Sequence, residues 1–312
     1  MNALKRKISK LTDLIIRGKL IEIFIRILNN IKYYSRRCFY KFEKRTNIIR
    51  NIKYFYLSKK YRSFIKSEAR SNQSSKFTYV GGGHKAIIWR LWLQGVDEAP
   101  EVCKVCLESL RHWHSDREII TLDKDNLSQY ITLPDYIEDK HERGIISHTH
   151  YSDLIRLQLL YEHGGTWIDS TVYCTGRRYE SIMHMPLFVF RENHFSSLAS
   201  NWFIVADSHH PIIKLTRDLL FAYWKDHNHL MHYFIFHMFF KMAAEAYNDI
   251  WAHVPFVSNR MPHEMQFSMY QDYSDDKMKY FASISDFHKL TYHKKDIPSS
   301  SILQHILESY EY

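Results

Sequence analysis

The strongest constraint on the fold lies in residues 150–173, which read HYSDLIRLQLLYEHGGTWIDSTVY. Apolar residues recur every three or four positions in the first half, a spacing typical of an amphipathic helix. Gly164 and Gly165 then interrupt this pattern before the short apolar segment 166–168. A helix often ends at a left-handed glycine, and a second glycine permits a tight turn. The stretch therefore predicts a helix, a turn and a strand, with Asp169 at the carboxyl end of the strand.

Four polar side chains in this stretch are candidates for a binding site. Ser152 is expected to cap the helix, because a serine hydroxyl can accept a hydrogen bond from an unpaired backbone N–H. Asp153 and Arg156 are three residues apart and share one helix face. Open α/β sheets bind ligands beyond the carboxyl ends of their strands, so Asp153, Arg156 and Asp169 are expected to meet at one crevice. Spacing alone leaves an alternative, a surface Asp–Arg pair and an aspartate in a turn.

The segments upstream alternate between strand and helix patterns. Residues 86–89 and 117–123 are predicted as strands, residues 99–114 as the helix between them, and residues 133–140 as a short helix. This alternation predicts an α/β domain with a mostly parallel sheet flanked by helices. Beyond residue 185, two more strand patterns precede two helix patterns. Residues 67–84 are polar and then rich in glycine, which indicates a linker.

The basic residues are concentrated at the N-terminus. Residues 1–70 contain 20 Lys and Arg and four acidic residues, a net charge of +16. The remaining 23 basic and 30 acidic residues give a net charge of −7. Short apolar clusters at helical spacing predict a basic amphipathic helical arm, so the expected division is residues 1–75 as arm and linker and residues 76–312 as the α/β domain.

Three kinds of partner fit such an arm. An anionic membrane surface attracts basic amphipathic helices. The helices could instead pack on the domain or on another protein. Nucleic acid is disfavoured, since no known nucleic-acid-binding module accompanies the charge. No run of 18 apolar residues and no secretory signal is present in the sequence, so we expect a cytoplasmic protein held peripherally at the inner face of the cytoplasmic membrane.

The core pattern resembles a known family. S-D-x-x-R-x-x-x-L-x-x-x-G-G-x-[WY]-[IL]-D is similar to the donor-sugar motif of glycosyltransferase family 32 and of the clostridial glucosylating toxins. The chain more closely resembles bacterial capsular polysaccharide synthesis proteins, over about residues 84–293, with IIWRLWLQG upstream and YFIFH downstream. The resemblance implies a GT-A fold, with a Rossmann-like nucleotide-binding domain. It also implies transfer of a sugar, with retention, from a nucleotide donor such as a UDP-sugar to a growing surface glycan such as capsule or lipopolysaccharide.

The resemblance also assigns roles within the motif. Asp153 and Arg156 would contact hydroxyls of the donor sugar, and Asp169 would be the first carboxylate of an Asp-x-Asp motif, near the ribose and a Mn²⁺ or Mg²⁺ ion. The second carboxylate is replaced by Thr171. A neutral hydroxyl is a poorer ligand for such a hard cation. Thr171 would therefore ligate weakly, another residue such as His288 would complete the shell, or the dependence on metal would be reduced.

Further candidates lie outside the motif. Trp89 or Trp92 could stack on the nucleotide base, although core packing is the alternative for both, and Gln94 could hydrogen-bond to the base or sugar. Asp123 ends the second predicted strand at the same sheet edge. Lys289 lies in the segment 287–295, which could close over the diphosphate or could be a solvated basic loop.

The absence of a second carboxylate in the motif, together with the basic arm, leaves one competing function. The chain could be a non-catalytic binding or scaffolding protein that docks on the membrane.

Overall fold

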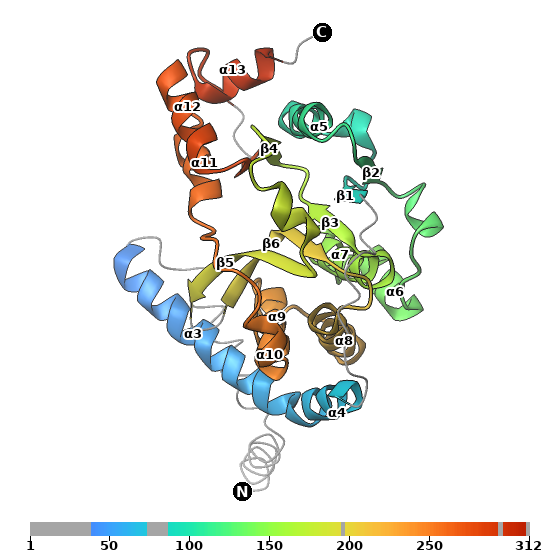
Figure 1. The fold of residues 1–312 in the computed structure, drawn as a ribbon. Helices are drawn as coiled ribbons and strands as arrows, with labels where there is room; N and C mark the ends of the chain where they lie inside the picture. The colour runs from blue at the N-terminus through green and yellow to red at the C-terminus, as the bar shows by residue number, and fades with distance from the viewer. Residues whose placement is uncertain (1–38, 74–86, 195–196, 293–295, 310–312) are drawn as a thin grey trace, which may run out of the picture.

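The computed structural model describes residues 39–73, 87–194, 197–292 and 296–309 (Figure 1). The helices are α3 Phe39–Lys60, α4 Arg62–Gln73, α5 Glu101–Trp113, α6 Asp135–Glu142, α7 His148–His163, α8 Pro211–Asp226, α9 Ile235–Ala246, α10 Asn248–Trp251, α11 Glu264–Ser268, α12 Asp275–Ile284 and α13 Ile302–Glu308. The strands are β1 Ile87–Leu91, β2 Glu118–Leu122, β3 Gly165–Ile168, β4 Val172–Cys174, β5 Leu187–His194, β6 Ser197–Ala206 and β7 Phe287–Lys289.

The central sheet has the strand order β2-β1-β3-β6-β5. The strand β1 pairs in parallel with both β2 and β3, whereas β6 pairs antiparallel with β3 and β5. Four strands therefore point in one direction and β6 points in the other. This arrangement confirms the predicted α/β class with a mostly parallel sheet. Strands β4 and β7 form a separate antiparallel pair.

The two faces of the sheet are buried against different layers. Side chains alternate between the faces along each strand. Trp89 and Ile204 belong to the large core that contains residues of α7, α8 and α9. Ile88 and Phe203 belong to the opposite core, which includes residues of α5, β4 and β7. Figure 1 shows α8 and α9 below the sheet and α5 above it. Because both faces are covered, the strands read as nearly continuous apolar runs.

The N-terminal helices α3 and α4 are part of this folded unit. Tyr54, Leu57 and Tyr61 are buried in the same core as α8 and α9. The Lys53 ammonium donates a 2.7 Å hydrogen bond to the Met231 carbonyl oxygen, within the same layer. Helices are thus present where the sequence predicts an amphipathic arm, and residues 53–65 pack on the α/β domain, which is one of the alternatives that the sequence leaves open. Residues 1–38 of the predicted arm lie outside the described residues.

The helix α7 begins earlier than the sequence predicts. Its N-cap is Ser147, whose extended backbone precedes the first helical residue and whose side chain accepts a hydrogen bond from His150 N. The prediction that Ser152 caps this helix is therefore wrong. Residues 148–151 contain neither proline nor glycine, and Tyr151 is buried, so packing extends the helix by one turn toward the N-terminus.

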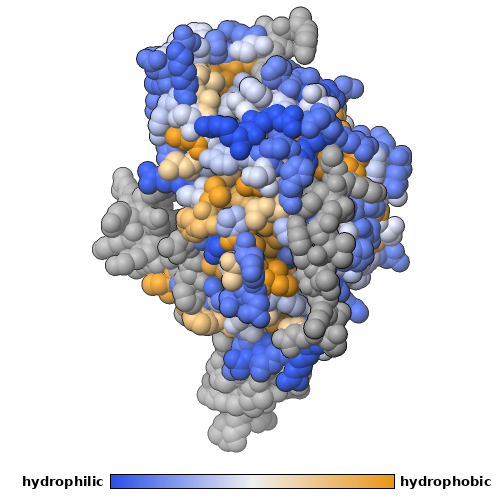
Figure 2. Space-filling view, viewed as in Figure 1, coloured by the Kyte–Doolittle hydropathy of each residue, from blue (hydrophilic) through white to orange (hydrophobic). Residues whose placement is uncertain are grey.

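The hydropathy of the surface differs between regions of the molecule. Figure 2 shows hydrophilic side chains over the upper part of this face, where the C-terminal helices lie, and apolar side chains gathered in its middle. Within the described ranges, no helix is both long enough and apolar enough to cross a bilayer.

Candidate active site

A polar pocket opens at the carboxyl ends of β1 and β3. Its cavity volume is about 290 Å³. The lining residues come from the loop after β1, from α7, from the turn after β3 and from β7 with the residues that follow it: Leu91, Trp92, Leu93, Gln94, His148, Thr149, Ser152, Arg156, Trp167, Asp169, Ser170, Thr171, Lys289 and Tyr292. Helices α5 and α7 lie on opposite faces of the sheet beside this point, which is where open α/β sheets bind ligands.

The two glycines place β3 in its position. Gly164 ends α7 with φ +67°, and a Cβ added there would lie 2.8 Å from Ser208 N. Gly165 has φ +98°, and its Cβ would lie 2.9 Å from the Ile87 carbonyl oxygen. No other residue has both this backbone freedom and this small size. The pair lets β3 run close beside β1, which directs Asp169 into the pocket.

The turn that carries Asp169 is tied to β1. Val172 N donates to the Asp169 carbonyl oxygen at 3.1 Å, which closes the turn. The Ser170 hydroxyl donates to the Leu91 carbonyl oxygen, and the Arg90 guanidinium donates to the Ser170 carbonyl oxygen, both at 2.8 Å. Arg90 is 2 % exposed, and burial lowers its pKa to about 10, so it stays protonated at neutral pH. Arg90 is therefore a buried positioning residue for the turn.

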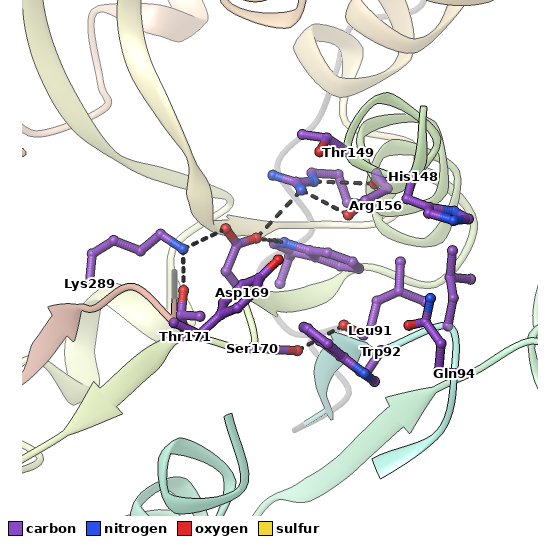
Figure 3. A pocket seen from close by; sticks show the side chains of 14 residues that line it. Leu91, Trp92, Gln94, His148, Thr149, Arg156, Asp169, Ser170, Thr171 and Lys289 are labelled. Carbon is purple, nitrogen blue, oxygen red and sulfur yellow. Dashed lines mark hydrogen bonds and ion pairs between the residues drawn. The ribbon is translucent and has the colours of Figure 1, made fainter. Parts of the chain in front are cut away.

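The carboxylate of Asp169 lies between two cations (Figure 3). Lys289 Nζ is 3.1 Å from Oδ2, and Arg156 Nη2 is 3.4 Å from Oδ1. The indole of Trp167 also donates to Oδ1, at 2.9 Å. Burial by itself would raise the pKa of Asp169, but the charges of Lys289 and Arg156 and the hydrogen bonds outweigh it, so the pKa is below its usual value. Asp169 is consequently ionised at neutral pH.

A buried network of hydrogen bonds and an ion pair fixes the Arg156 side chain. Its guanidinium lies 3.5 Å from the carboxylate of Asp153, donates to the Ser152 hydroxyl at 3.0 Å and donates to the Asn201 carbonyl oxygen. The Asn201 amide in turn donates to Asp153 at 2.9 Å. The guanidinium also lies over the ring of Trp167, 4.8 Å from its centroid. Asp153 does not line the pocket, so the structure makes it a support for Arg156.

The strand β7 brings Lys289 to the pocket and turns His288 away from it. Adjacent strand residues point to opposite faces, so the two side chains cannot share one site. Lys289 contacts both Asp169 and the Thr171 hydroxyl. His288 is fully buried with Nε2 2.9 Å from the Thr175 hydroxyl, and burial lowers its pKa to about 3. The expectation that His288 completes a metal shell with Thr171 is not met by this geometry.

The other predicted residues divide into two groups. Trp92 and Gln94 line the pocket. Trp89 is 1 % exposed and donates its indole N–H to the Gly164 carbonyl oxygen at 2.8 Å, so it is buried in the core and cannot stack on a ligand. The Asp123 carboxylate accepts hydrogen bonds from the backbone N–H groups of residues 125 and 126 and stabilises its own turn, outside the pocket lining. The predictions that Trp89 stacks on the nucleotide base and that Asp123 belongs to the site are therefore wrong.

Three residues at the site, Trp167, Asn201 and Tyr292, were not among the candidates predicted from the sequence. Trp167 lies within the quoted motif, so its position was visible although its hydrogen bond to Asp169 was not. Tyr292 packs edge-to-face on Trp92 with ring centroids 5.5 Å apart, from 200 residues further along the chain. Asn201 is in β6, and only the antiparallel pairing of β6 with β3 brings it near Asp153. No local sequence pattern could have indicated Asn201 or Tyr292.

The donor set of the pocket fits a divalent metal ion poorly. No cluster of three His, Cys, Asp or Glu side chains occurs in the part of the chain that the structure describes. Asp169 and Thr171 are the expected ligands, and the ammonium of Lys289 contacts both. Two unit charges 4 Å apart near a protein surface interact by about 4 kcal/mol, so repulsion between this ammonium and a divalent ion would be roughly twice as large.

The fold and the pocket together define a class of protein. A mostly parallel α/β sheet with a polar, cationic pocket at its carboxyl edge is typical of proteins that bind phosphorylated or nucleotide ligands. The profile of one family, capsular polysaccharide synthesis protein, matches residues 34–308. The chain therefore belongs to the capsular polysaccharide synthesis family. This match begins within the basic arm and includes α3 and α4.

Comparison with solved structures gives weaker likenesses. A chain titled PaToxG glycosyltransferase is 16 % identical with a TM-score of 0.38, and the match covers 65 % of this chain and 81 % of that one. A second chain, titled as a mutant transferase, is 11 % identical with a TM-score of 0.32, and the match covers 56 % of this chain and 88 % of that one. Both TM-scores are too low to establish a shared fold. No curated protein matches in sequence.

Proposed function

We propose that this protein is a glycosyltransferase that moves a sugar from a nucleotide-sugar donor to a growing bacterial surface glycan. The observation that carries the proposal is the division of one pocket into an aromatic part and a cationic part. Trp92 and Tyr292 form the aromatic part, and Arg156 and Lys289 flank Asp169 in the cationic part. A nucleotide-sugar has the matching parts, because its base is flat and its diphosphate is anionic. Membership of the capsular polysaccharide synthesis family supports the same reaction class.

The pocket residues can be matched to the parts of such a donor. The base would lie against Trp92, since aromatic side chains bind flat rings, and Gln94 would hydrogen-bond to the base or ribose. The diphosphate would lie next to Lys289 and Arg156. Hydroxyl and imidazole groups of α7 also line the pocket, at His148, Thr149 and Ser152, and they offer hydrogen bonds to the sugar.

The chemistry follows from where negative charge develops. When the bond between the anomeric carbon and the diphosphate breaks, the bonding electrons stay on the departing phosphate oxygen. Cations fixed in advance near that oxygen stabilise the transition state. Asp169 keeps the side chains of Lys289 and Arg156 in place by ion pairs on its two oxygens. By the resemblance, the donor is UDP-linked, the transfer retains the anomeric configuration, and the acceptor is a glycan or lipid-linked glycan.

A screen of nucleotide-sugars tests the proposal. Purified protein is incubated with UDP-, GDP-, CDP- and dTDP-sugars, and released nucleotide and changes in melting temperature are measured. Tyr292→Ala is expected to weaken the effect of the cognate donor, because it removes an aromatic partner from the pocket. Tyr280→Ala, on α12 and of similar exposure (51 % against 41 %), is the matched control. If no donor is hydrolysed or stabilises the protein, the transferase assignment is wrong and the binding or scaffolding alternative is favoured.

We also propose that the N-terminal segment holds the enzyme at the membrane where such glycans are assembled. Residues 1–38 contain ten Lys and Arg and two acidic residues, a net charge of +8. Basic residues near an anionic membrane surface each contribute about 1 kcal/mol of attraction. This segment precedes the helices that pack on the α/β domain, so the two parts of the predicted arm would have different roles.

A further inference from the structure

The cationic part of the pocket contains an ammonium group where a metal ion would be expected. We propose that Lys289 takes the place of the divalent cation, so that the protein binds the diphosphate of its donor without a metal. This inference rests on the proposed function, since it concerns how the same pocket holds a nucleotide-sugar.

The backbone fixes the position of Lys289. In the β4–β7 pair, Lys289 lies directly opposite Val172, the first residue after the Asp169–Thr171 turn. Leu290 N donates to the Thr171 carbonyl oxygen at 2.8 Å and extends this pairing beyond the strand. Phe287 anchors β7 in the core that it shares with α5 and β4. Strand pairing therefore fixes the backbone of the lysine beside the turn, within reach of the Asp169 and Thr171 side chains.

The contacts of the ammonium are those that a metal would make. Lys289 Nζ donates to Asp169 Oδ2 at 3.1 Å and also to the Thr171 hydroxyl. These are the two side chains at the first and third positions of the Asp-x-Thr turn. An ammonium has three N–H donors, so one remains for a phosphate oxygen. The Lys289 side chain is 21 % exposed and lines the pocket, so a ligand can reach it.

The charge balance explains why a metal is not needed. A turn with two carboxylates would repel a diphosphate, and a divalent ion would be required to neutralise that charge. Here the second carboxylate is replaced by Thr171, and the single carboxylate of Asp169 is shared by Lys289 and Arg156. With the buried Asp153 carboxylate 3.5 Å from Arg156 included, two cations and two carboxylates give a net charge of zero, whereas a carboxylate at position 171 would make it negative. Among the described residues that line the pocket, Asp169 is the only carboxylate.

Calorimetry on the full chain tests the inference. The probes are UDP, GDP, CDP, ADP and dTDP, each titrated into protein in EDTA and into protein with excess MnCl₂. The tightest probe is expected to bind with the same Kd in both solutions. Lys289→Met, which keeps the length and removes the charge, is expected to weaken binding in EDTA roughly 10- to 100-fold, as for loss of a hydrogen bond to a charged group. Lys279→Met, an exposed lysine on α12, is the control and should leave the Kd unchanged.

A second measurement follows the metal directly. Electron paramagnetic resonance of Mn²⁺ is expected to show no ion bound to the wild-type protein, and to show a bound ion in the double variant Lys289→Ala, Thr171→Asp, which removes the ammonium and adds a carboxylate.

The outcomes separate the two proposals. Nucleotide binding that requires Mn²⁺, or that is equally tight in folded Lys289→Met, would overturn the role of Lys289 and leave the transferase proposal standing. If no probe binds in either solution, the proposed function fails and this inference fails with it. The comparison of EDTA with MnCl₂ uses the wild-type protein alone, so it tests binding without a metal even if Lys289→Met does not fold.

Discussion

Replacing Asp169 by asparagine should destabilise the protein by about 2 kcal/mol at neutral pH. The wild-type carboxylate lies 3.1 Å from Lys289 and 3.4 Å from Arg156, and its side chain is 23 % exposed. Exposed ion pairs contribute about 0–1 kcal/mol, whereas removing one partner of a fully buried pair costs about 3–5 kcal/mol. A partly buried carboxylate with two partners falls between these limits. The asparagine oxygen can still accept from Trp167, but its NH₂ group would then face the Lys289 ammonium, donor against donor.

The pH dependence gives this prediction a second test. The folded-state pKa of Asp169 is lowered, so its stabilisation is complete above the ordinary aspartate pKa of about 3.9 and is lost as the pH falls through the lowered value. The stability difference between wild type and Asp169→Asn should therefore be constant from about pH 8 to pH 5 and shrink in more acidic solution. Donor hydrolysis should also fall, by roughly 10²- to 10³-fold, because the two cations lose their common anchor.

Urea unfolding followed by circular dichroism measures the stability, with Asp125→Asn as a control in an exposed turn. An expected loss of this size lowers the melting temperature by roughly 4 °C. If Asp169→Asn is as stable as wild type at pH 7 and hydrolyses the donor at the wild-type rate, the ion pairs do not organise the site and the reasoning is refuted.

Three further predictions concern the strand, the turn and the arm. Gly165→Ala should lower the free energy of unfolding in urea by about 1–3 kcal/mol more than Gly144→Ala does. Both residues have positive φ, but only at position 165 would the Cβ meet the backbone of β1. Equal losses of stability in the two variants would contradict this. Arg90→Lys should lower the free energy of unfolding by about 1–3 kcal/mol, since the shorter side chain loses its bond to the Ser170 carbonyl oxygen, and an unchanged unfolding midpoint would speak against this role. The protein should sediment with phosphatidylglycerol vesicles at low salt and be released at high salt. Equal binding by a chain that lacks residues 1–38 would show that this segment is not the anchor.

Periodicity and glycine placement were enough to predict the main architecture. Alternating strand and helix patterns predicted the mostly parallel α/β class, and the Gly-Gly pair predicted the turn from α7 into β3 with Asp169 at the strand's carboxyl end. These features depend on local backbone preferences and on the spacing of apolar residues, which a sequence displays directly. The expectation that Trp92 and Gln94 lie near the site came from the family resemblance and from side-chain chemistry, and both residues line the pocket.

Tertiary structure alone decided which polar groups meet and which are buried. Trp89 and Trp92 are three residues apart, yet one is in the core and the other lines the pocket, because a strand ends between them. His288 and Lys289 are adjacent, and the pairing of β7 with β4 chooses which of them faces Asp169. Strand pairing between segments more than 100 residues apart sets these contacts, and its register leaves no local trace in the sequence. The identity of the cation beside Asp169 therefore became visible only when the chain was folded.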